Sequence, residues 1–171
     1  MTDIRVRPEG PTDVAAVRAV VHDAFRAPDR PDPPEPALVD ALRDSDAWRP
    51  GLSIVAERDG EVVAYALLTR VAVEPGGQPA LSLGPVAVLP AYQGSGLGTA
   101  VVRAALDAAR EQGERLVVVL GSPDYYGRFG FGPATGLTAP WSGSEHWQAH
   151  TQDGRPLPAG EVAYPAPWFA L

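Results

Sequence analysis

The sequence predicts a single mixed α/β domain in which helices flank a twisted central sheet. An Asp-Gly dipeptide at residues 59–60 separates two long apolar runs, a pattern typical of an antiparallel hairpin. Apolar runs at 81–88 and 116–120 enclose a glycine-rich loop and an amphipathic segment, which is typical of a β-loop-α-β unit with parallel strands. We therefore expect a sheet that is antiparallel at its start and parallel at its centre. The 171 residues show no internal repeat and no long linker, so one domain over residues 1–171 is expected.

The charge of the chain argues against nucleic acid as a partner. The formal net charge is −7, and the arginines are scattered rather than gathered into a stripe, so no basic field is available to neutralise a phosphate backbone. The first residues form no apolar signal segment, and nowhere do about 18 apolar residues follow one another, the length that a membrane helix needs. We expect a cytoplasmic protein that binds neither nucleic acid nor membrane.

The absence of cysteine limits metal and redox chemistry. With no cysteine, the sequence offers no disulfide, no thiolate nucleophile and no cysteine metal ligand. The three histidines, His22, His146 and His150, lack the H-E-x-x-H spacing of a helical zinc site. No metal site is expected.

The N-terminus predicts a strand and a helix. Residues 4–7 form a short alternating segment that suits an edge strand. Thr12 or Asp13 can cap a helix over 14–25, where apolar residues recur at helical spacing.

A loop, a second helix and a hairpin follow. Five prolines make 27–36 a loop, because proline removes a hydrogen-bond donor and restricts the residue before it. Apolar residues then fall on one helical face from Ala37 through Trp48, and Pro50-Gly51 ends the pattern. The runs at 52–57 and 61–74 are expected to be the two strands of the hairpin.

The strand at 81–88 contains Gly84-Pro85, which interrupts its hydrogen-bond ladder and predicts a bulge that splays it from its neighbour. The helix after the loop is expected from about Thr99 to Gln112, where Gly113 suits its end. The uninterrupted apolar run at 116–120 suits a parallel strand that is covered on both faces. The apolar stripe expected on the helix consists of Val102, Ala105, Leu106 and Ala109.

The glycine-rich loop before this helix predicts a site for phosphate. Glycines alternate at Gly94, Gly96 and Gly98, and they place backbone N–H groups at the positive end of the helix dipole. A Walker loop would need a lysine after Gly98, and a dinucleotide fold would need a third glycine at Thr99. Asp124 follows the second strand as a ribose-binding acid would, but no further β-α unit comes after it. A simple tight turn explains three alternating glycines poorly.

Three segments together resemble one family, the GNAT superfamily of acyl-coenzyme A dependent N-acetyltransferases. Its signature [QR]-x-x-G-x-[GA] is matched by Gln93, Gly96 and Gly98. The preceding V-A-V-L-P-A-Y at 86–92 is also similar, and L-G-S-P-D-Y-Y-G-R-F-G-F at 120–131 resembles the YhbS-like branch. The resemblance covers about residues 3–135 in the order of elements. It implies a GNAT fold with splayed central strands and a C-terminal part, 132–171, that contributes to the acceptor site.

The resemblance implies acetyl-CoA as the acyl donor. Backbone N–H groups of the loop would bind the pyrophosphate, and the bulged strand would pair with the pantetheine as if it were an added strand. Ser122 either touches the acyl or pantetheine chain or caps the helix that begins around Pro123, and we favour the cap. The cofactor-binding residues expected are Val86, Ala87, Val88, Gln93, Gly94, Ser95, Gly96, Leu97, Gly98, Thr99, Ser122 and Tyr126.

The chemistry that the resemblance implies is direct attack of a neutral primary amine on the thioester, through a tetrahedral intermediate. The backbone N–H of Val88 or its neighbour would polarise the carbonyl. Tyr126 lies four residues before Gly130-Phe131, where the family's helix-borne tyrosine protonates the leaving thiolate. The alternative is that Tyr126 only packs against the cofactor, with its hydroxyl hydrogen-bonded. Tyr125 is expected to face the core or the substrate cleft.

The general base is less well defined. Glu74, at the end of the third strand, is the most plausible carboxylate by position. A water chain to the strand backbone could serve instead. The other reading of Glu74 is a solvated charge at a strand end, and we favour that reading.

The acceptor is a small-molecule or peptide amine, and an acidic chain suits a cationic one. Glu161 to Tyr164 is expected to be a last strand. The aromatic residues of the tail either wall an acceptor pocket or only pack as a satellite cluster; they and two histidines are Trp141, Trp147, Trp168, His146 and His150. The rival function is a non-catalytic domain that binds an acyl-CoA as a sensor or interaction module. Dimers are common among the proteins that this chain resembles, so a homodimer is a candidate assembly.

Overall fold

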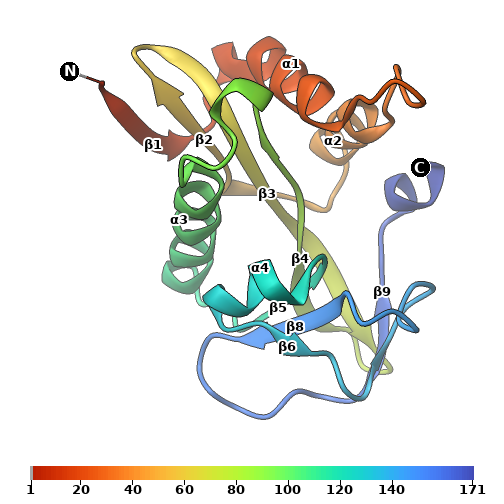
Figure 1. The fold of residues 1–171 in the computed structure, drawn as a ribbon. Helices are drawn as coiled ribbons and strands as arrows, with labels where there is room; N and C mark the ends of the chain where they lie inside the picture. The colour runs from red at the N-terminus through yellow and green to blue at the C-terminus, as the bar shows by residue number, and fades with distance from the viewer. Residues whose placement is uncertain (1) are drawn as a thin grey trace.

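A computed structural model describes residues 2–171 and shows an open, twisted sheet with helices on both faces (Figure 1). Its strands run in the order β1-β2-β3-β4-β5-β8-β6, with β9 paired to β3 and β7 paired to β9. Within the described residues, only the β4–β5 and β7–β9 pairs are parallel. The predicted mixed fold is confirmed, with a sheet that is mostly antiparallel. The strands are β1 (Ile4–Pro8), β2 (Trp48–Arg58), β3 (Glu61–Glu74), β4 (Gln78–Val88), β5 (Leu116–Leu120), β6 (Gly132–Pro133), β7 (Leu137–Thr138), β8 (Trp147–Thr151) and β9 (Gly160–Ala163).

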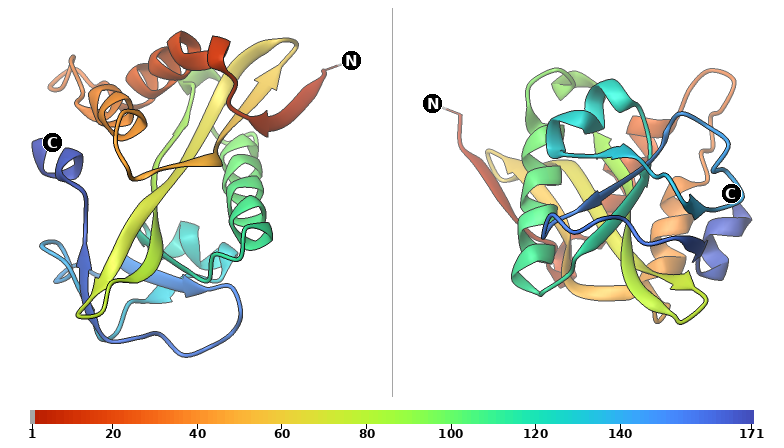
Figure 2. Two further views of the ribbon diagram at one scale, coloured as in Figure 1. Left: turned by 180° about the vertical axis from the view of Figure 1, so that it is seen from behind. Right: turned by 90° about the horizontal axis from the view of Figure 1, so that it is seen from below.

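The helices lie on opposite faces of the sheet (Figures 1 and 2). α1 and α2 pack on one face, around Val17, Leu42 and Tyr65, while α3 packs on the other, around Val102 and Ala105. The α-helices are α1 (Val14–Phe25), α2 (Glu35–Arg43), α3 (Leu97–Glu111) and α4 (Pro123–Tyr126). The 3₁₀ helices are η1 (Pro11–Asp13), η2 (Pro90–Tyr92), η3 (Gly127–Phe129) and η4 (Ala166–Ala170). None of the helices described is long and apolar enough to cross a membrane.

The first strands and helix follow the sequence closely. β1 pairs with β2 at the edge of the sheet, and the β2–β3 hairpin turns at Asp59 and Gly60, both at positive φ as a tight hairpin turn requires. α1 has the predicted bounds. Asp13 occupies its N-cap position, but the carboxylate accepts hydrogen bonds from Gly10 N–H (2.7 Å) and from Arg7 instead of capping the helix.

The second helix is shorter than its apolar pattern. α2 begins at Glu35 rather than Ala37, because proline is tolerated in the first turn, where the N–H has no partner within the helix. It ends at Arg43, so the expectation of a helix through Trp48 was wrong. Trp48 begins β2, and the guanidinium of Arg43 lies 4.7 Å from the centre of its ring. The tryptophan therefore still packs against the core that α2 contributes to, but from a strand instead of a helix.

The central β-loop-α-β unit is confirmed. α3 begins at Leu97, two residues earlier than expected, and the predicted stripe of Val102, Ala105, Leu106 and Ala109 is buried. β5 is covered on both faces, since Val117 and Val119 belong to one core cluster and Leu116 and Val118 to another.

The predicted bulge and splay are present in β4. Leu68 of β3 pairs with Leu83 and Ala66 pairs with Val86, so Gly84 and Pro85 together face the single residue Leu67. The parallel pairing of β4 with β5 ends at the same point, because Leu83–Val119 is its last pair. Beyond Leu83 the two central strands separate, and the edge of β4 is left open.

The C-terminal segment completes the sheet in a way that the sequence did not indicate. β8 pairs antiparallel with β5, and β9 pairs with the end of β3, one residue before the predicted 161–164. The strand that follows η3 is the two-residue β6, which starts at Gly132. η4 then returns against α2, as the two views of Figure 2 show.

Candidate functional site

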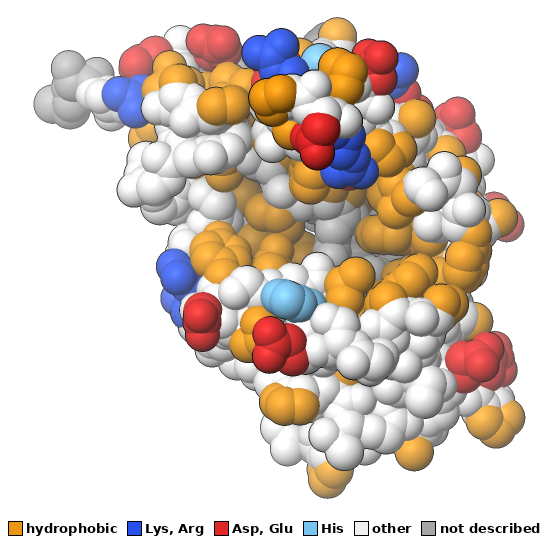
Figure 3. Space-filling model, turned by 45° about the vertical axis from the view of Figure 1, so that its right-hand side comes forward, with side chains coloured by type: hydrophobic (Ala, Val, Ile, Leu, Met, Phe, Trp, Pro, Cys, Tyr) orange, Lys and Arg blue, Asp and Glu red, His pale blue; other side chains and the backbone are white. Residues whose placement is uncertain are grey.

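Two adjoining cavities lie where β4 and β5 separate. A groove of about 600 Å³ runs along β4 to the start of α3, and a second cavity of about 430 Å³ lies between α2, β4 and the C-terminal segment. Phe25, Val86 and Tyr126 line both of them. The hollow between the upper and lower halves of the molecule, with hydrophobic side chains along its walls, is visible in Figure 3.

The loop before α3 supplies a row of free amide groups to the groove. Gly94 and Gly96 have φ of +78° and +87°, the left-handed region that favours glycine. The first helical hydrogen bond of α3 is from Ala100 N–H to Gly96 O. In residues 2–171 no hydrogen bond is made by the N–H groups of 94–99. These donors, at the positive end of a helix dipole, form an anion site.

At Gly98 close packing, rather than a positive φ, favours glycine. A Cβ at this position would lie 3.0 Å from the hydroxyl of Tyr125 and 3.4 Å from Val88. Arg128 stacks over the Tyr125 ring at 4.4 Å and donates to its carbonyl oxygen, and both residues line the groove. One wall of the anion site therefore carries a cation.

The open edge of β4 forms another wall of the groove. Leu89 N–H donates to Val63 O of β3, so by strand alternation the backbone groups of Val86 and Val88 point away from β3. β5 has already separated there, which leaves this edge without a strand partner. An extended chain with amide groups can add to such an edge.

Tyr126 occupies the wall that the two cavities share. Its ring lies over Gly121, where a Cβ would come within 2.2 Å of the ring, and meets the ring of Phe131 edge-on at 5.9 Å. Burial, together with the neighbouring Tyr125, raises the pKa of the phenol to about 12. No residue of 2–171 accepts or donates a hydrogen bond at its hydroxyl, so the phenol is a fixed, protonated donor with no protein partner.

Of the twelve predicted cofactor residues, nine line the groove, two offer backbone groups only, and Ser122 lies outside it. Those that line the groove are Val86, Ala87, Val88, Gln93, Gly94, Gly96, Gly98, Thr99 and Tyr126. The side chain of Leu97 is buried in the core, and the Ser95 hydroxyl donates to Tyr92 O, so these two offer backbone groups only. The Gln93 amide donates to Val88 O at 3.1 Å and holds the loop against the strand.

Ser122 and Glu74 lie outside both cavities. Ser122 is at the N-cap position of α4 but makes no side-chain capping bond, so the favoured cap is not formed; its carbonyl accepts from Tyr126 N–H instead. Glu74 lies at the far end of β3, beside the turn, where its carboxylate accepts from Gly77 N–H. It is six residues beyond Leu68 at the bulge, about 20 Å along the strand. The structure does not bring Glu74 to Tyr126.

The second cavity is walled by aromatic residues of the tail. Trp141 meets Tyr164 edge-on at 4.7 Å, and Tyr164 meets Trp168 at 5.4 Å, and all three line the cavity. Trp147 packs in the core beneath, with its indole N–H on Leu137 O. The aromatic residues of the tail therefore divide between the two expected roles: Trp141 and Trp168 line a cavity, while Trp147 packs in the core.

The two tail histidines line neither cavity. His146 contacts Ser144, and His150 lies under Gly130 with Nδ1 3.2 Å from its carbonyl oxygen. Burial lowers the pKa of His150, which makes it a neutral packing residue. Among residues 2–171, no three His, Cys, Asp or Glu side chains are grouped as a metal site requires.

Several residues that line the cavities were not expected from the sequence, and three of them matter for the chemistry of the site. Phe25 ends α1 and reaches the junction of the cavities, Arg128 lies on the groove, and Glu35 begins α2 beside the second cavity. Only Arg128 has a local signal, because it lies three residues after Tyr125 within the Y-Y-G-R block. Phe25 and Glu35 reach the site through the packing of α1 and α2, which no short motif encodes.

Comparison with known proteins agrees with this geometry. Residues 18–131 match the profile of the family described as Acetyltransferase (GNAT) family. The chain is 32% identical over 148 residues, 85% of each chain, to the uncharacterized N-acetyltransferase YhbS of Escherichia coli strain K12. It is 35% identical over 127 residues, 73% of this chain and 67% of the relative, to the uncharacterized N-acetyltransferase YjhQ of the same strain.

Solved structures give the same result. A GNAT family acetyltransferase from Brucella melitensis, in complex with acetyl-CoA, has a TM-score of 0.82 and 37% identity, over 97% of this chain and 98% of the other. Escherichia coli YhbS in complex with CoA has a TM-score of 0.83 and 32% identity, over 98% of this chain and 92% of the other.

Proposed function

This chain belongs to the GNAT acetyltransferase family, and on that basis we propose that it is an N-acetyltransferase that moves the acetyl group of acetyl-CoA to a primary amine of a small molecule or peptide. The observation that carries the proposal is the position of Tyr126 on the wall common to the groove and the second cavity. A proton donor placed there can act on a bond between a donor in one cavity and an acceptor in the other.

The groove suits acetyl-CoA in charge and shape. The free N–H groups of 94–99 and the guanidinium of Arg128 match an anionic pyrophosphate. The open backbone edge at Val86 and Val88 matches the amide groups of pantetheine, which would bind as an added strand. The acetyl-CoA complex of the Brucella melitensis relative supports this assignment.

The transfer needs three tasks from the protein. As the amine nitrogen bonds to the acetyl carbon, the N–H of Val88 or Val86 donates to the carbonyl oxygen, where negative charge develops. When the carbon–sulfur bond breaks, Tyr126 donates its phenolic proton toward the departing sulfur and regains a proton from water. The proton of the amine passes to water in the cavity, because Glu74 lies at the far end of β3.

One sample can test binding and turnover together. The purified protein is titrated with acetyl-CoA by calorimetry and then assayed for thiol release with a panel of amines, with desulfo-CoA as a non-reacting competitor. Binding followed by amine-dependent thiol release is the expected result. Tight binding without release across the panel supports the sensor function instead, and absence of binding contradicts the assignment of the groove.

A further inference from the structure

The second cavity suits a ligand that combines a cationic group with an apolar body. Three aromatic residues, Trp141, Tyr164 and Trp168, form a connected wall, and Phe25 and Leu38 add apolar surface. Aromatic faces attract cations through their quadrupole and pack well against an apolar body. The volume of about 430 Å³ suits a small molecule rather than a long peptide.

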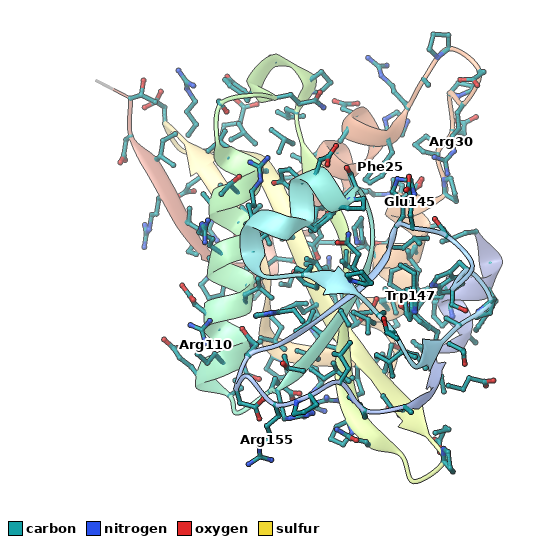
Figure 4. The ribbon with its side chains drawn as sticks, turned by 60° about the horizontal axis from the view of Figure 1, so that its bottom comes forward. Phe25, Arg30, Arg110, Glu145, Trp147 and Arg155 are labelled. Carbon is teal, nitrogen blue, oxygen red and sulfur yellow. The ribbon has the colours of Figure 1, made fainter. Side chains whose placement is uncertain are left out.

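The charges on the cavity have one sign. Within the described residues, Glu35 is the one charged side chain that lines it, and no lysine, arginine or histidine does so. The Glu35 side chain is 9% exposed, whereas its ion-pair partner Arg30, with NH2 2.7 Å from Oε1, is 49% exposed. Arg30 lies on the loop between α1 and α2 (Figure 4) and does not line the cavity. Arg30 lines neither cavity and is half exposed to water, so of the two ion-pair partners it is Glu35 that a ligand in the second cavity meets.

We infer that the acceptor is a small primary ammonium with an apolar body and no carboxylate, and that Glu35 holds its cationic group beside the Trp141–Tyr164–Trp168 wall. This inference rests on the proposed transferase function and narrows its acceptor. An acceptor that carries a carboxylate, such as a free amino acid, would lose the hydration of that carboxylate with no cationic side chain to replace it. Glu35 is a specificity-determining residue, because it binds the acceptor as the ammonium. The bound ammonium then gives one proton to water, and the neutral amine attacks the thioester.

A matched pair of acceptors tests the inference. Phenethylamine and phenylalanine share an aromatic body and a primary amine and differ by one carboxylate. The kcat/KM of the wild-type protein is expected to be at least about tenfold higher for phenethylamine than for phenylalanine. Equal or better use of phenylalanine would overturn the inference.

Two variants separate the role of the carboxylate from that of the ion pair. Glu35→Gln is expected to raise the KM for phenethylamine about tenfold, with kcat and the Kd for acetyl-CoA within about twofold of wild type. Arg30→Gln breaks the same ion pair but leaves the carboxylate, so its KM is expected to stay unchanged or to fall. If both variants raise KM equally, the pair has only a structural role and the inference fails. Glu145→Gln, at an exposed carboxylate outside this cavity, is the control.

A binding measurement distinguishes failure of the inference from failure of the proposed function. Phenethylamine is titrated by calorimetry into the CoA-loaded protein and into the CoA-loaded Glu35→Gln variant. Binding that weakens in the variant supports the inference even when no amine releases thiol, and in that case the transferase proposal alone fails. No binding, or binding equal in both proteins, overturns the inference whatever the activity.

Discussion

The groove and the second cavity share a wall but are built in different ways. The groove presents backbone: the N–H groups of 94–99 and the open edge of β4 at Val86 and Val88. The second cavity presents side chains from α2, β4 and the C-terminal segment, which are far apart in sequence. A backbone site needs particular glycines in one continuous segment, whereas a side-chain site needs only that the fold bring its residues together. Under the proposed function, the groove binds acetyl-CoA through its backbone, and the second cavity selects the acceptor through its side chains.

The sharpest way to break this comparison is to remove the left-handed backbone of the loop. Gly96→Val places a β-branched residue at φ +87°, where such side chains are strained, so the loop loses the arrangement of its N–H groups. The affinity for acetyl-CoA should fall roughly 100-fold or more by calorimetry.

Gly143→Val is the matched control for this loss. Gly143 has open space around its Cβ position and no positive φ, so this variant should bind acetyl-CoA as the wild type does. Retained affinity in Gly96→Val would mean that the groove does not bind through its backbone.

Removing the hydroxyl of Tyr126, on the wall shared by the two cavities, should lower turnover without weakening acetyl-CoA binding. Tyr126→Phe removes the hydroxyl and keeps the ring over Gly121, so kcat should fall about 100-fold while the Kd for acetyl-CoA changes less than twofold. Tyr92→Phe, on η2 and outside both cavities, should leave kcat unchanged. An unchanged kcat in Tyr126→Phe would reduce Tyr126 to a packing residue.

The raised pKa of Tyr126 also predicts how kcat depends on pH. The pKa of Tyr126 is raised to about 12, so the protonated phenol persists as pH rises and ionises only near that value. The wild-type kcat measured from pH 7 to pH 10 should therefore show no alkaline decline. A decline below pH 10 that disappears in Tyr126→Phe would contradict the buried, protonated state of this tyrosine.

The smallest effect on stability and on acetyl-CoA binding is expected from a substitution at Ser122. Ser122 lies at the end of β5 but lines neither cavity, and it makes no capping bond. Ser122→Ala should change the free energy of unfolding by less than about 0.5 kcal/mol in urea titration, compared with about 1 kcal/mol for a lost cap. It should also leave the Kd for acetyl-CoA unchanged, and a tenfold weaker Kd would return Ser122 to the groove.

The accuracy of the sequence predictions follows the same division. The hairpin turn at 59–60, the bulge at Gly84-Pro85 and the loop at 94–99 depend on local backbone preferences, and all three are present in the structure. The residues of the loop and of β4 could be named because glycine and proline have few other uses in such positions.

The rest depends on contacts that no local pattern records. Trp48 continues the apolar face of α2 in sequence, yet it packs in the same core from β2, since a periodicity does not state which element supplies a side chain. Glu74 ends the third strand as expected, but the open edge of β4 at Val86 pairs with Ala66, eight residues before Glu74 on β3. Phe25 and Glu35 line the cavities only because α1 and α2 pack together there.

The most direct test of the transferase itself is a single-turnover experiment. The protein is loaded with one equivalent of acetyl-CoA and mixed with phenethylamine, and the acetylated amine is followed by mass spectrometry. The account predicts one acetyl amide and one free CoA per protein, formed about 100-fold faster by the wild type than by Tyr126→Phe. Intact acetyl-CoA on both proteins, with phenethylamine and with every other amine of the panel, would contradict the transferase and identify a domain that only binds its acyl-CoA.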